Sequence, residues 1–263
     1  MINKTIHYCW FGQNSKPKLV EKCIKSWKKY CPDYKIIEWN EVNFDIASAP
    51  LYVRQAYEAK KWAFATDYIR LWIIYNYGGI YLDTDVELIK SLDPLLHHNC
   101  FIGRQPGYLV NTGAGFGAIP HHPLIKIMLD DYNDIAFIKD NGEMDLWTCP
   151  HRNSQWLLKN GLKLEDSYQE ITDAAIYPVE YFSPLDAYTR HLKITDNTYS
   201  VHHCDATWKP SETMLRKNMR HIEYLLKESR HTITHIPHRL MRRLIGDNDY
   251  ETLKQKLKGT RTK

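Results

Sequence analysis

The chain lacks the features that define several large protein classes. It has no run of about eighteen apolar residues, the length that a membrane-spanning helix requires, and its N-terminal residues carry no apolar core of the secretory-signal type. Its six cysteines are scattered without a CxxC pair, and neither an internal repeat nor a low-complexity segment is present. These absences predict a globular cytoplasmic protein with reduced thiols, without a zinc site or a disulfide framework.

Charge is unevenly distributed along the chain. The net charge of the 263 residues is +4, but residues 209–263 contain fourteen Lys or Arg and six Asp or Glu, a balance of +8 that leaves −4 for the rest. An acidic body followed by a basic segment predicts that this segment meets an anionic surface. The sign of the charge changes near Pro210. We therefore expect one domain over residues 1–208 and a basic helical tail over 209–263.

Strand-like and helix-like patterns alternate along the acidic body. We expect strands over residues 5–11, 34–39, 80–88, 100–103, 175–178 and 199–203, and helices over 17–31, 50–77 and 123–138. The long helix is expected to break near Lys60-Lys61, and Gly78-Gly79 is expected to end it because glycine readily adopts the left-handed cap. The alternation predicts an α/β fold with a mostly parallel sheet flanked by helices.

Two carboxylates follow this glycine turn and a short apolar strand. Because side chains alternate along an extended strand, Tyr81, Asp83, Asp85 and Glu87 are expected on one face. Adjacent acids repel one another without a cation, and hard oxygen ligands suit Mg²⁺ or Mn²⁺, which usually share coordination with substrate phosphates. The strand therefore predicts a site for a metal and a phosphorylated sugar. The alternative is a sheet edge that its charges keep soluble.

Two further observations bear on this prediction. A second DxD, Asp247-Asn248-Asp249, lies in a polar turn and is interpreted as solvated surface, so the motif alone carries little information. In the preceding helix, Asp67 and Arg70 are three residues apart and share a face. A guanidinium and a carboxylate can bind sugar hydroxyls and phosphate oxygens. The alternative for this pair is an ordinary ion pair on a helix surface.

The motifs together resemble the DxD sugar-binding region of glycosyltransferase family 32, which is similar to the glucosylating domain of the large clostridial toxins. The central resemblance lies in Thr66-Asp67-x-x-Arg70, Gly78-Gly79-Ile-Tyr81-Leu-Asp83-Thr-Asp85 and Leu92-Asp93. It extends to Ile6-His7-Tyr-Cys-Trp10-Phe-Gly12, Asn111, His122-Pro123 and His202-His203-x-x-x-x-Trp208. The resemblance implies a single GT-A type domain around a nucleotide-binding sheet. It also implies transfer of a sugar from a nucleotide donor, usually a UDP-sugar, with retention of the anomeric configuration.

The resemblance also implies a role for each matching residue. The catalytic set would be Asp67, Arg70, Asp83 and Asp85. The donor would be bound by Trp10 on the base, Tyr81 near the base or ribose, Asp67, Arg70 and Asn111 on the sugar, Asp83 on the ribose, and Trp208 on the diphosphate. The metal, Mn²⁺ or Mg²⁺, would be held by Asp83, Asp85 and His203. Simpler alternatives are a core position for Trp10, a turn for Asn111 and a structural role for His203.

Two positions leave the implied site open. His202 competes with His203, because adjacent residues of a strand point to opposite faces and only one of them can reach the metal. Many family members have Thr-Gly-Pro where this chain has Thr148-Cys149-Pro150. We therefore expect the acceptor-facing loop to pack differently here. The following residues, His151-Arg152-Asn153, are either acceptor contacts or solvated loop residues.

The basic tail contains a short amphipathic segment, residues 237–246, that begins with proline and ends with glycine. Arg239, Arg242 and Arg243 alternate there with apolar residues, which suits an anionic membrane surface. We therefore expect a cytoplasmic protein that binds the inner face of the plasma membrane through residues 232–263 and acts on a lipid-linked saccharide. The alternative is a solvated helix that closes the fold. No nucleic-acid partner is expected.

The leading functional hypothesis is a metal-dependent glycosyltransferase in capsular, exo- or lipopolysaccharide synthesis. Three alternatives remain open at this stage: the same fold acting on a protein acceptor, a glycoside hydrolase, and a sugar-nucleotide-binding module without turnover. Without a secretion signal or delivery domains, a toxin-like enzyme is disfavoured. Hydrolases need neither a divalent metal nor an activated donor, so metal dependence separates them from transferases.

Overall fold

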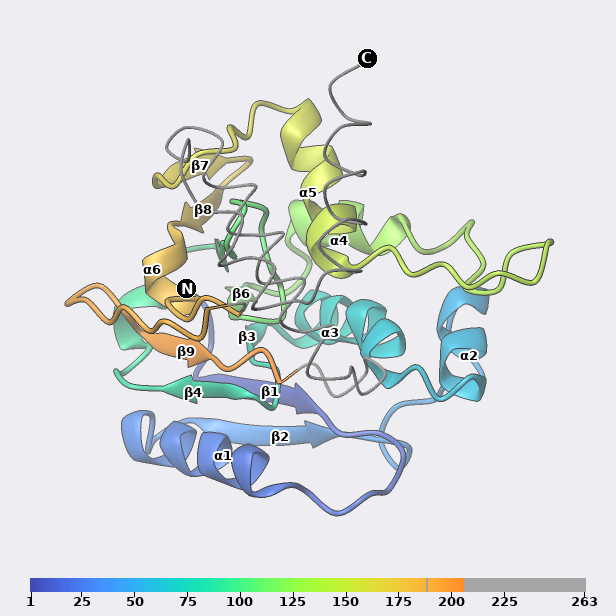
Figure 1. Ribbon diagram of the computed structural model, residues 1–263, viewed down its shortest axis with the longest axis horizontal. Helices are drawn as coiled ribbons and strands as arrows, with labels where there is room; N and C mark the ends of the chain where they lie inside the picture. The colour runs from blue at the N-terminus through green and yellow to red at the C-terminus, as the bar shows by residue number, and fades with distance from the viewer. Residues whose placement is uncertain (188, 206–263) are drawn as a thin grey trace, which may run out of the picture. The chain divides into compact units, whose positions relative to one another are not determined.

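The computed structural model describes residues 1–187 and 189–205. Their central element is a seven-stranded sheet in the order β2-β1-β3-β6-β5-β8-β7 (Figure 1). Its strands are β1 (Thr5–Cys9), β2 (Lys35–Trp39), β3 (Gly79–Tyr81), β5 (Cys100–Gly103), β6 (Phe116–Ala118), β7 (Gln169–Ile171) and β8 (Ala174–Tyr177). The pairings show that β6 and β7 run opposite to the other five strands. The predicted fold class, an α/β domain with a mostly parallel sheet flanked by helices, is confirmed.

Helices cover both faces of this sheet. They are α1 (Lys18–Tyr30), α2 (Leu51–Glu58), α3 (Trp62–Tyr77), α4 (Pro123–Asp130), α5 (Cys149–Lys159) and α6 (Val179–Phe182), with a 3₁₀ turn at Asp93–Leu95. Residues of α2, α3, α4 and α5 share one apolar cluster, whereas α1 and α6 belong to a second one. None of the helices in the described part of the chain is long and apolar enough to cross a membrane.

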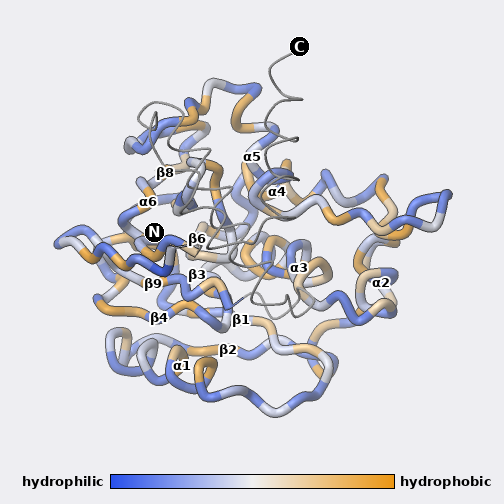
Figure 2. Tube along the Cα trace, viewed as in Figure 1, coloured by the Kyte–Doolittle hydropathy of each residue, from blue (hydrophilic) through white to orange (hydrophobic). Residues whose placement is uncertain are grey.

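Helix α3 lies inside the first apolar cluster and carries the predicted Asp67 and Arg70. Ten of its residues are buried, and its tube is mostly orange in Figure 2, in contrast to the partly blue α1. The predicted break near Lys60-Lys61 is confirmed, because α2 ends at Glu58 and Lys60 has a φ of 56° before α3 begins. Gly78 ends α3 with a φ of 64°, which glycine adopts at little cost. The chain then enters β3 at once.

A separate two-stranded sheet adjoins the site. It pairs β4 (Val86–Leu88) antiparallel with β9 (Ser200–His202), and Val86 lies opposite His202. The prediction of one continuous strand over residues 80–88 was wrong, because β3 ends at Tyr81 and a tight turn follows, closed by the Val86 N–H to Asp83 carbonyl hydrogen bond of 3.0 Å. Aspartates favour such turns because their side chains tolerate turn conformations.

Candidate active site

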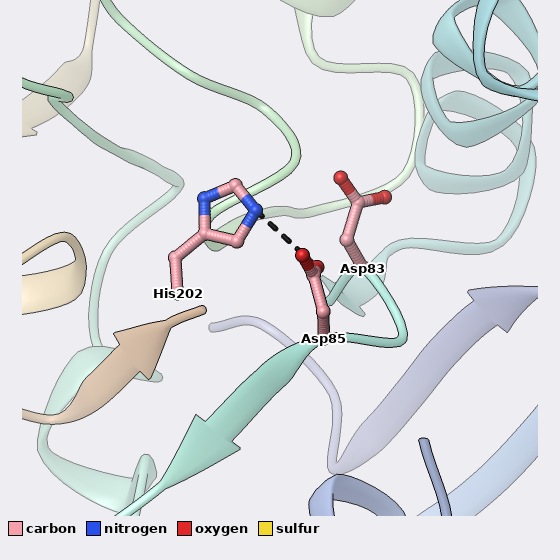
Figure 3. Close-up of side chains that lie close together, drawn as sticks. All are labelled: Asp83, Asp85 and His202. Carbon is pink, nitrogen blue, oxygen red and sulfur yellow. Dashed lines mark ion pairs between the residues drawn. The ribbon is translucent and has the colours of Figure 1, made fainter. Parts of the chain in front are cut away.

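The turn between β3 and β4 brings three potential metal ligands together. One carboxylate oxygen of Asp83, one of Asp85 and one ring nitrogen of His202 all lie within 4.8 Å of one another. Figure 3 shows both carboxylates on the turn and His202 reaching toward them from the end of β9. His202 Nε2 lies 3.3 Å from Asp85 Oδ1. Residues more than one hundred positions apart in the sequence thus meet because β4 and β9 pair.

The segment after β9 holds Asp85 in place. The backbone N–H of Asp205 donates to Asp85 Oδ2 at 2.9 Å, and that of His203 donates to the Asp85 carbonyl at 3.0 Å. Burial alone would raise the pKa of Asp85, but the charge and hydrogen bond of His202 and the Asp205 N–H outweigh it and lower that pKa to about 2. Asp85 is therefore ionised and fixed, as a metal ligand should be.

His203 lies elsewhere, which corrects the predicted ligand set. Its Nε2 lies 2.9 Å from Glu87 Oε2, and Glu87 in turn accepts a hydrogen bond from Lys22 Nζ at 2.7 Å. Neighbouring residues at the end of a strand point in opposite directions, so the position of His202 beside Asp85 sends His203 away. Glu87, expected on the same face as the two aspartates, also turns toward this second group. The geometry thus favours His202, the alternative that the sequence left open.

Arg70 connects the buried helix to the turn. Its Nη2 lies 3.2 Å from Asp67 Oδ1 and 3.1 Å from Asp83 Oδ1. The side chains of Asp67 and Arg70 are 9% and 4% exposed, whereas that of Asp83 is 27% exposed, so only Asp83 has a substantial open surface. The pair is therefore more than a surface ion pair, since Arg70 also positions the carboxylate that faces the metal site.

Asn111 and Gly113 form the wall of the site next to Asp83. Asn111 Oδ1 accepts the Gly113 N–H at 2.8 Å, and the Gly113 carbonyl accepts the Asp83 N–H at 3.0 Å. A Cβ added at Gly113 would stand 2.1 Å from Asp83 Oδ2 and 3.0 Å from Arg70 Nη1. The sequence marked Asn111 and the small residues after it, but it did not show that the glycine is required by contact with Asp83. Asn111 does make the predicted turn.

The departure at Thr148-Cys149-Pro150 lies directly at this wall. Cys149 is the first residue of α5, and its Sγ lies 3.3 Å from Arg70 Nη1. The two following residues with open roles are buried: Arg152 Nη2 pairs with Asp145 Oδ2 at 2.7 Å, and Asn153 Nδ2 donates to Thr112 Oγ1 at 2.9 Å. Both therefore stabilise the loops around the site, whereas His151 is exposed.

The aromatic residues of the implied donor site have different surroundings. Trp10 directly follows β1, is half-buried and donates from Nε1 to the Asn14 carbonyl at 2.8 Å. Tyr81 is 1% exposed, and its ring centroid lies 5.2 Å from the Arg70 guanidinium. The structure therefore encloses Tyr81 in the core beneath the site instead of opening it toward a base. Trp208 and Asp247-Asn248-Asp249 lie outside the described residues.

The chemistry of the three converging ligands fits a divalent metal. Two carboxylates and one imidazole supply oxygen and nitrogen donors that Mn²⁺ and Mg²⁺ accept, with Mn²⁺ the better match for imidazole. Asp83 and Asp85 are partly exposed, so a ligand can reach them. The arrangement therefore provides a partly open, negatively charged site at which a metal can bridge protein and substrate.

Comparison with known proteins places this site in a family. Residues 17–102, which include Asp67, Arg70, Asp83 and Asp85, match the model of the glycosyltransferase sugar-binding region containing the DXD motif. The chain belongs to this family of glycosyltransferases. The family predicted from the sequence is thus confirmed, and the DXD residues are those whose side chains converge with His202.

Curated relatives of the DXD family match about half of the chain. Inositol phosphoceramide mannosyltransferase 3 of Schizosaccharomyces pombe is 32% identical over 141 residues, which are 52% of this chain and 38% of the relative. Human alpha-1,4-N-acetylglucosaminyltransferase is 33% identical over 128 residues, which are 47% of this chain and 33% of the relative. The match thus spans well under half the length of either relative.

Solved glycosyltransferase structures are also similar to the chain. The PaToxG glycosyltransferase has a TM-score of 0.47 at 20% identity, with 60% of this chain and 68% of that chain covered. The galactosyltransferase LgtC, solved with donor and acceptor sugar analogs, has a TM-score of 0.43 at 16% identity, with 89% of this chain and 97% of that chain covered.

Burial of Asp67 has a measurable consequence for stability. Desolvation, with a contribution from Asp83, raises the pKa of Asp67 from 3.8 to about 6 against the opposing charge of Arg70. The folded protein therefore retains this proton where the unfolded chain has lost it. The stabilising contribution is complete below the unfolded pKa and disappears as the pH rises through about 6.

We therefore expect the free energy of unfolding of the wild type to fall relative to that of Asp67→Asn as the pH rises from about 4 to about 7, by about 3 kcal/mol. Asparagine does not titrate, so any constant loss from the weakened Arg70 contact cancels in this comparison. Urea unfolding of both proteins in metal-free buffer at several pH values measures the difference. A difference that does not change with pH would show that Asp67 has an ordinary pKa.

Proposed function

We propose that the protein is a metal-dependent, retaining glycosyltransferase that moves a sugar from a nucleotide donor, a UDP-sugar, to a saccharide acceptor. The observation that carries this proposal is the convergence of Asp83, Asp85 and His202 at the partly open turn between β3 and β4. Membership of the DXD glycosyltransferase family supports transfer over the hydrolase and binding-module alternatives. A cluster of acids with no counter-ion is unfavourable, whereas a metal with a bound diphosphate neutralises it.

The three side chains would hold Mn²⁺ or Mg²⁺, which when bound acts as a Lewis acid that stabilises charge on the leaving nucleoside diphosphate. Arg70 holds Asp83 in position through the contact of 3.1 Å, and Asp67 holds Arg70 from the other side. The N–H groups of His203 and Asp205 hold Asp85. The site is therefore preorganised, and little reorganisation is needed when charge develops on the diphosphate.

The position of Asp67 bears on how configuration is retained. A covalent route would need a carboxylate free to attack the anomeric carbon, but Asp67 is buried and engaged by Arg70. We propose instead that the acceptor hydroxyl attacks from the face that the diphosphate leaves, and that a phosphate oxygen accepts its proton. The carbon–oxygen bond to the diphosphate breaks as the new glycosidic bond forms. In this scheme the role of Asp67 is to orient Arg70.

A panel of nucleotide sugars tests the proposed function directly. Purified protein is incubated with each donor and Mn²⁺ in the absence of an acceptor, and slow release of the nucleoside diphosphate is measured. We expect release from at least one UDP-sugar, and its loss when EDTA removes the metal. Turnover of a simple glycoside without metal would instead support a hydrolase, and donor binding without release would support a binding module.

The ligand set makes a separate prediction about the two histidines. His202→Ala removes an imidazole beside Asp85, so we expect Mn²⁺ to bind at least tenfold more weakly, measured by calorimetry with UDP present. His203→Ala is the matched control, because its ring contacts Glu87 and not the aspartates. We expect that variant to bind Mn²⁺ within about threefold of the wild type. The reverse ranking would restore the ligand that the sequence first suggested.

We propose further that the acceptor is a lipid-linked saccharide reached at the inner face of the plasma membrane, in surface polysaccharide synthesis. Two observations support this: the basic segment over residues 237–246 and the relatedness to a mannosyltransferase named for inositol phosphoceramide. The segment lies outside the described residues.

This membrane proposal is tested in the full-length chain. Arg239→Glu, Arg242→Glu and Arg243→Glu together should weaken binding to vesicles of phosphatidylglycerol and phosphatidylcholine about 100-fold, at about 1 kcal/mol for each basic residue near an anionic surface. Binding is measured by co-sedimentation at low and high salt. Equal binding of the variant and the wild type would remove the membrane proposal and leave the transferase proposal intact.

A further inference from the structure

A thiol stands among the buried polar groups behind the metal-binding carboxylates. Cys149 is 6% exposed, and its Sγ lies 3.3 Å from Arg70 Nη1 and 4.0 Å from Asn111 Oδ1. Its thiol and its backbone N–H also hydrogen-bond Asp67. The first residue of α5 thus contacts all three polar groups that surround the space beside Asp83.

The opposite wall of this space has no side chain at all. A Cβ added at Gly113 would approach the same Arg70 Nη1 to 3.0 Å, and Asn111 Oδ1 to 3.1 Å. Arg70 Nη1 is therefore bounded by the bare backbone of Gly113 on one side and by the Cys149 sulfur on the other. Replacing the sulfur by a smaller group would enlarge the space without moving its polar floor.

Arg70 also has hydrogen-bonding capacity left over. Its Nε is buried and has no partner among the described residues. A buried guanidinium N–H without an acceptor costs about 1–3 kcal/mol, so this part of the structure favours an incoming oxygen. A thiol is a weak hydrogen-bond partner, and a sugar hydroxyl can replace its contact with Arg70 at little cost.

We propose that Cys149 is a specificity-determining residue that limits the size of the donor-sugar substituent facing α5, so that the site takes a nucleotide hexose with a free hydroxyl there and rejects its N-acetylated counterpart. This inference rests on the proposed function and names the substrate class of the same site. A hydroxyl fits between Gly113 and the Cys149 sulfur, whereas an N-acetyl group needs the volume that the sulfur occupies. Cys149 binds no metal in this scheme.

Matched donor pairs test the proposal without an acceptor. The pairs are UDP-glucose with UDP-N-acetylglucosamine and UDP-galactose with UDP-N-acetylgalactosamine, and the readout is kcat/KM for UDP release with Mn²⁺. We expect the wild type to prefer the hexose by at least about tenfold and Cys149→Ala to reduce that preference at least about tenfold, the effect of a group the size of a methylene in a closed pocket. Cys149→Ser, which nearly keeps the volume, should retain the preference.

The ratio of two donors cancels any general loss of folded or active protein. Cys23→Ala is the control for removal of a buried thiol, because Cys23 lies in the second apolar cluster, and its donor ratio should equal that of the wild type. A wild-type preference for the N-acetylated donor, or an unchanged ratio in Cys149→Ala, would overturn the inference while donor turnover still upheld the transferase. If the wild type releases UDP from no donor, the proposed function itself fails.

Discussion

Asp85→Ala should abolish sugar transfer while leaving the fold intact. Asp85 is the carboxylate fixed by His202 and by the N–H of Asp205, and it is one of the three groups that would hold the metal. Loss of metal-assisted charge stabilisation is worth several kcal/mol, so we expect donor turnover to fall at least about 1,000-fold. The measurement is UDP release at saturating Mn²⁺, with circular dichroism to confirm folding.

The second DxD supplies the control for this variant. Asp249→Ala removes an aspartate from the same three-residue pattern, which the sequence assigns to solvated surface, so its turnover should be normal. Near-normal turnover of Asp85→Ala with added Mn²⁺ would show that the metal assignment is wrong. Loss of turnover in both variants would mean that the second motif also takes part in function.

Gly113→Ala should be nearly as damaging, although it adds only one carbon atom. The new Cβ would lie 2.1 Å from Asp83 Oδ2, a separation that no real pair of these atoms can keep, so Asp83 or the 111–113 backbone must move. A displacement of about 1 Å at a reacting centre can cost about 100-fold in rate. We therefore expect donor turnover to drop at least about 100-fold and Mn²⁺ affinity, measured by calorimetry with UDP, to drop with it.

Gly142→Ala provides the matched comparison. An added Cβ there meets nothing within 4 Å, and the residue's φ of 80° means that the substitution has only the backbone penalty of about 1 kcal/mol. Turnover and Mn²⁺ affinity should match the wild type at a temperature well below unfolding. If Gly113→Ala also left metal affinity unchanged, the contact between Gly113 and Asp83 would have no part in forming the site.

The sequence predicted those parts of the fold that depend on local pattern. Apolar periodicity and the glycine pair located α3 and its end at Gly78, and the break before Trp62 followed from the polar Lys60-Lys61. The strands β1, β2, β8 and β9 also lie where alternating apolar residues placed them. Each of these features depends on a few neighbouring residues.

The parts that the sequence did not predict depend on contacts between distant segments. Nothing local shows that β4 leaves the main sheet to pair with β9, yet this pairing decides that His202 and not His203 reaches Asp85. The link from Arg70 to Asp83, and the need for glycine at position 113, likewise arise only when α3, β3 and the 111–113 loop meet. The carboxylates were found from the sequence, and the third ligand required the sheet register.

The most direct test is a crystal of the protein grown with UDP and Mn²⁺, measured at a wavelength where manganese scatters anomalously. We predict one anomalous peak in contact with Asp83, Asp85 and His202, with the diphosphate of UDP on its other side. A map with UDP bound but no manganese at these three side chains, or with manganese held by other residues, would contradict the proposed metal centre.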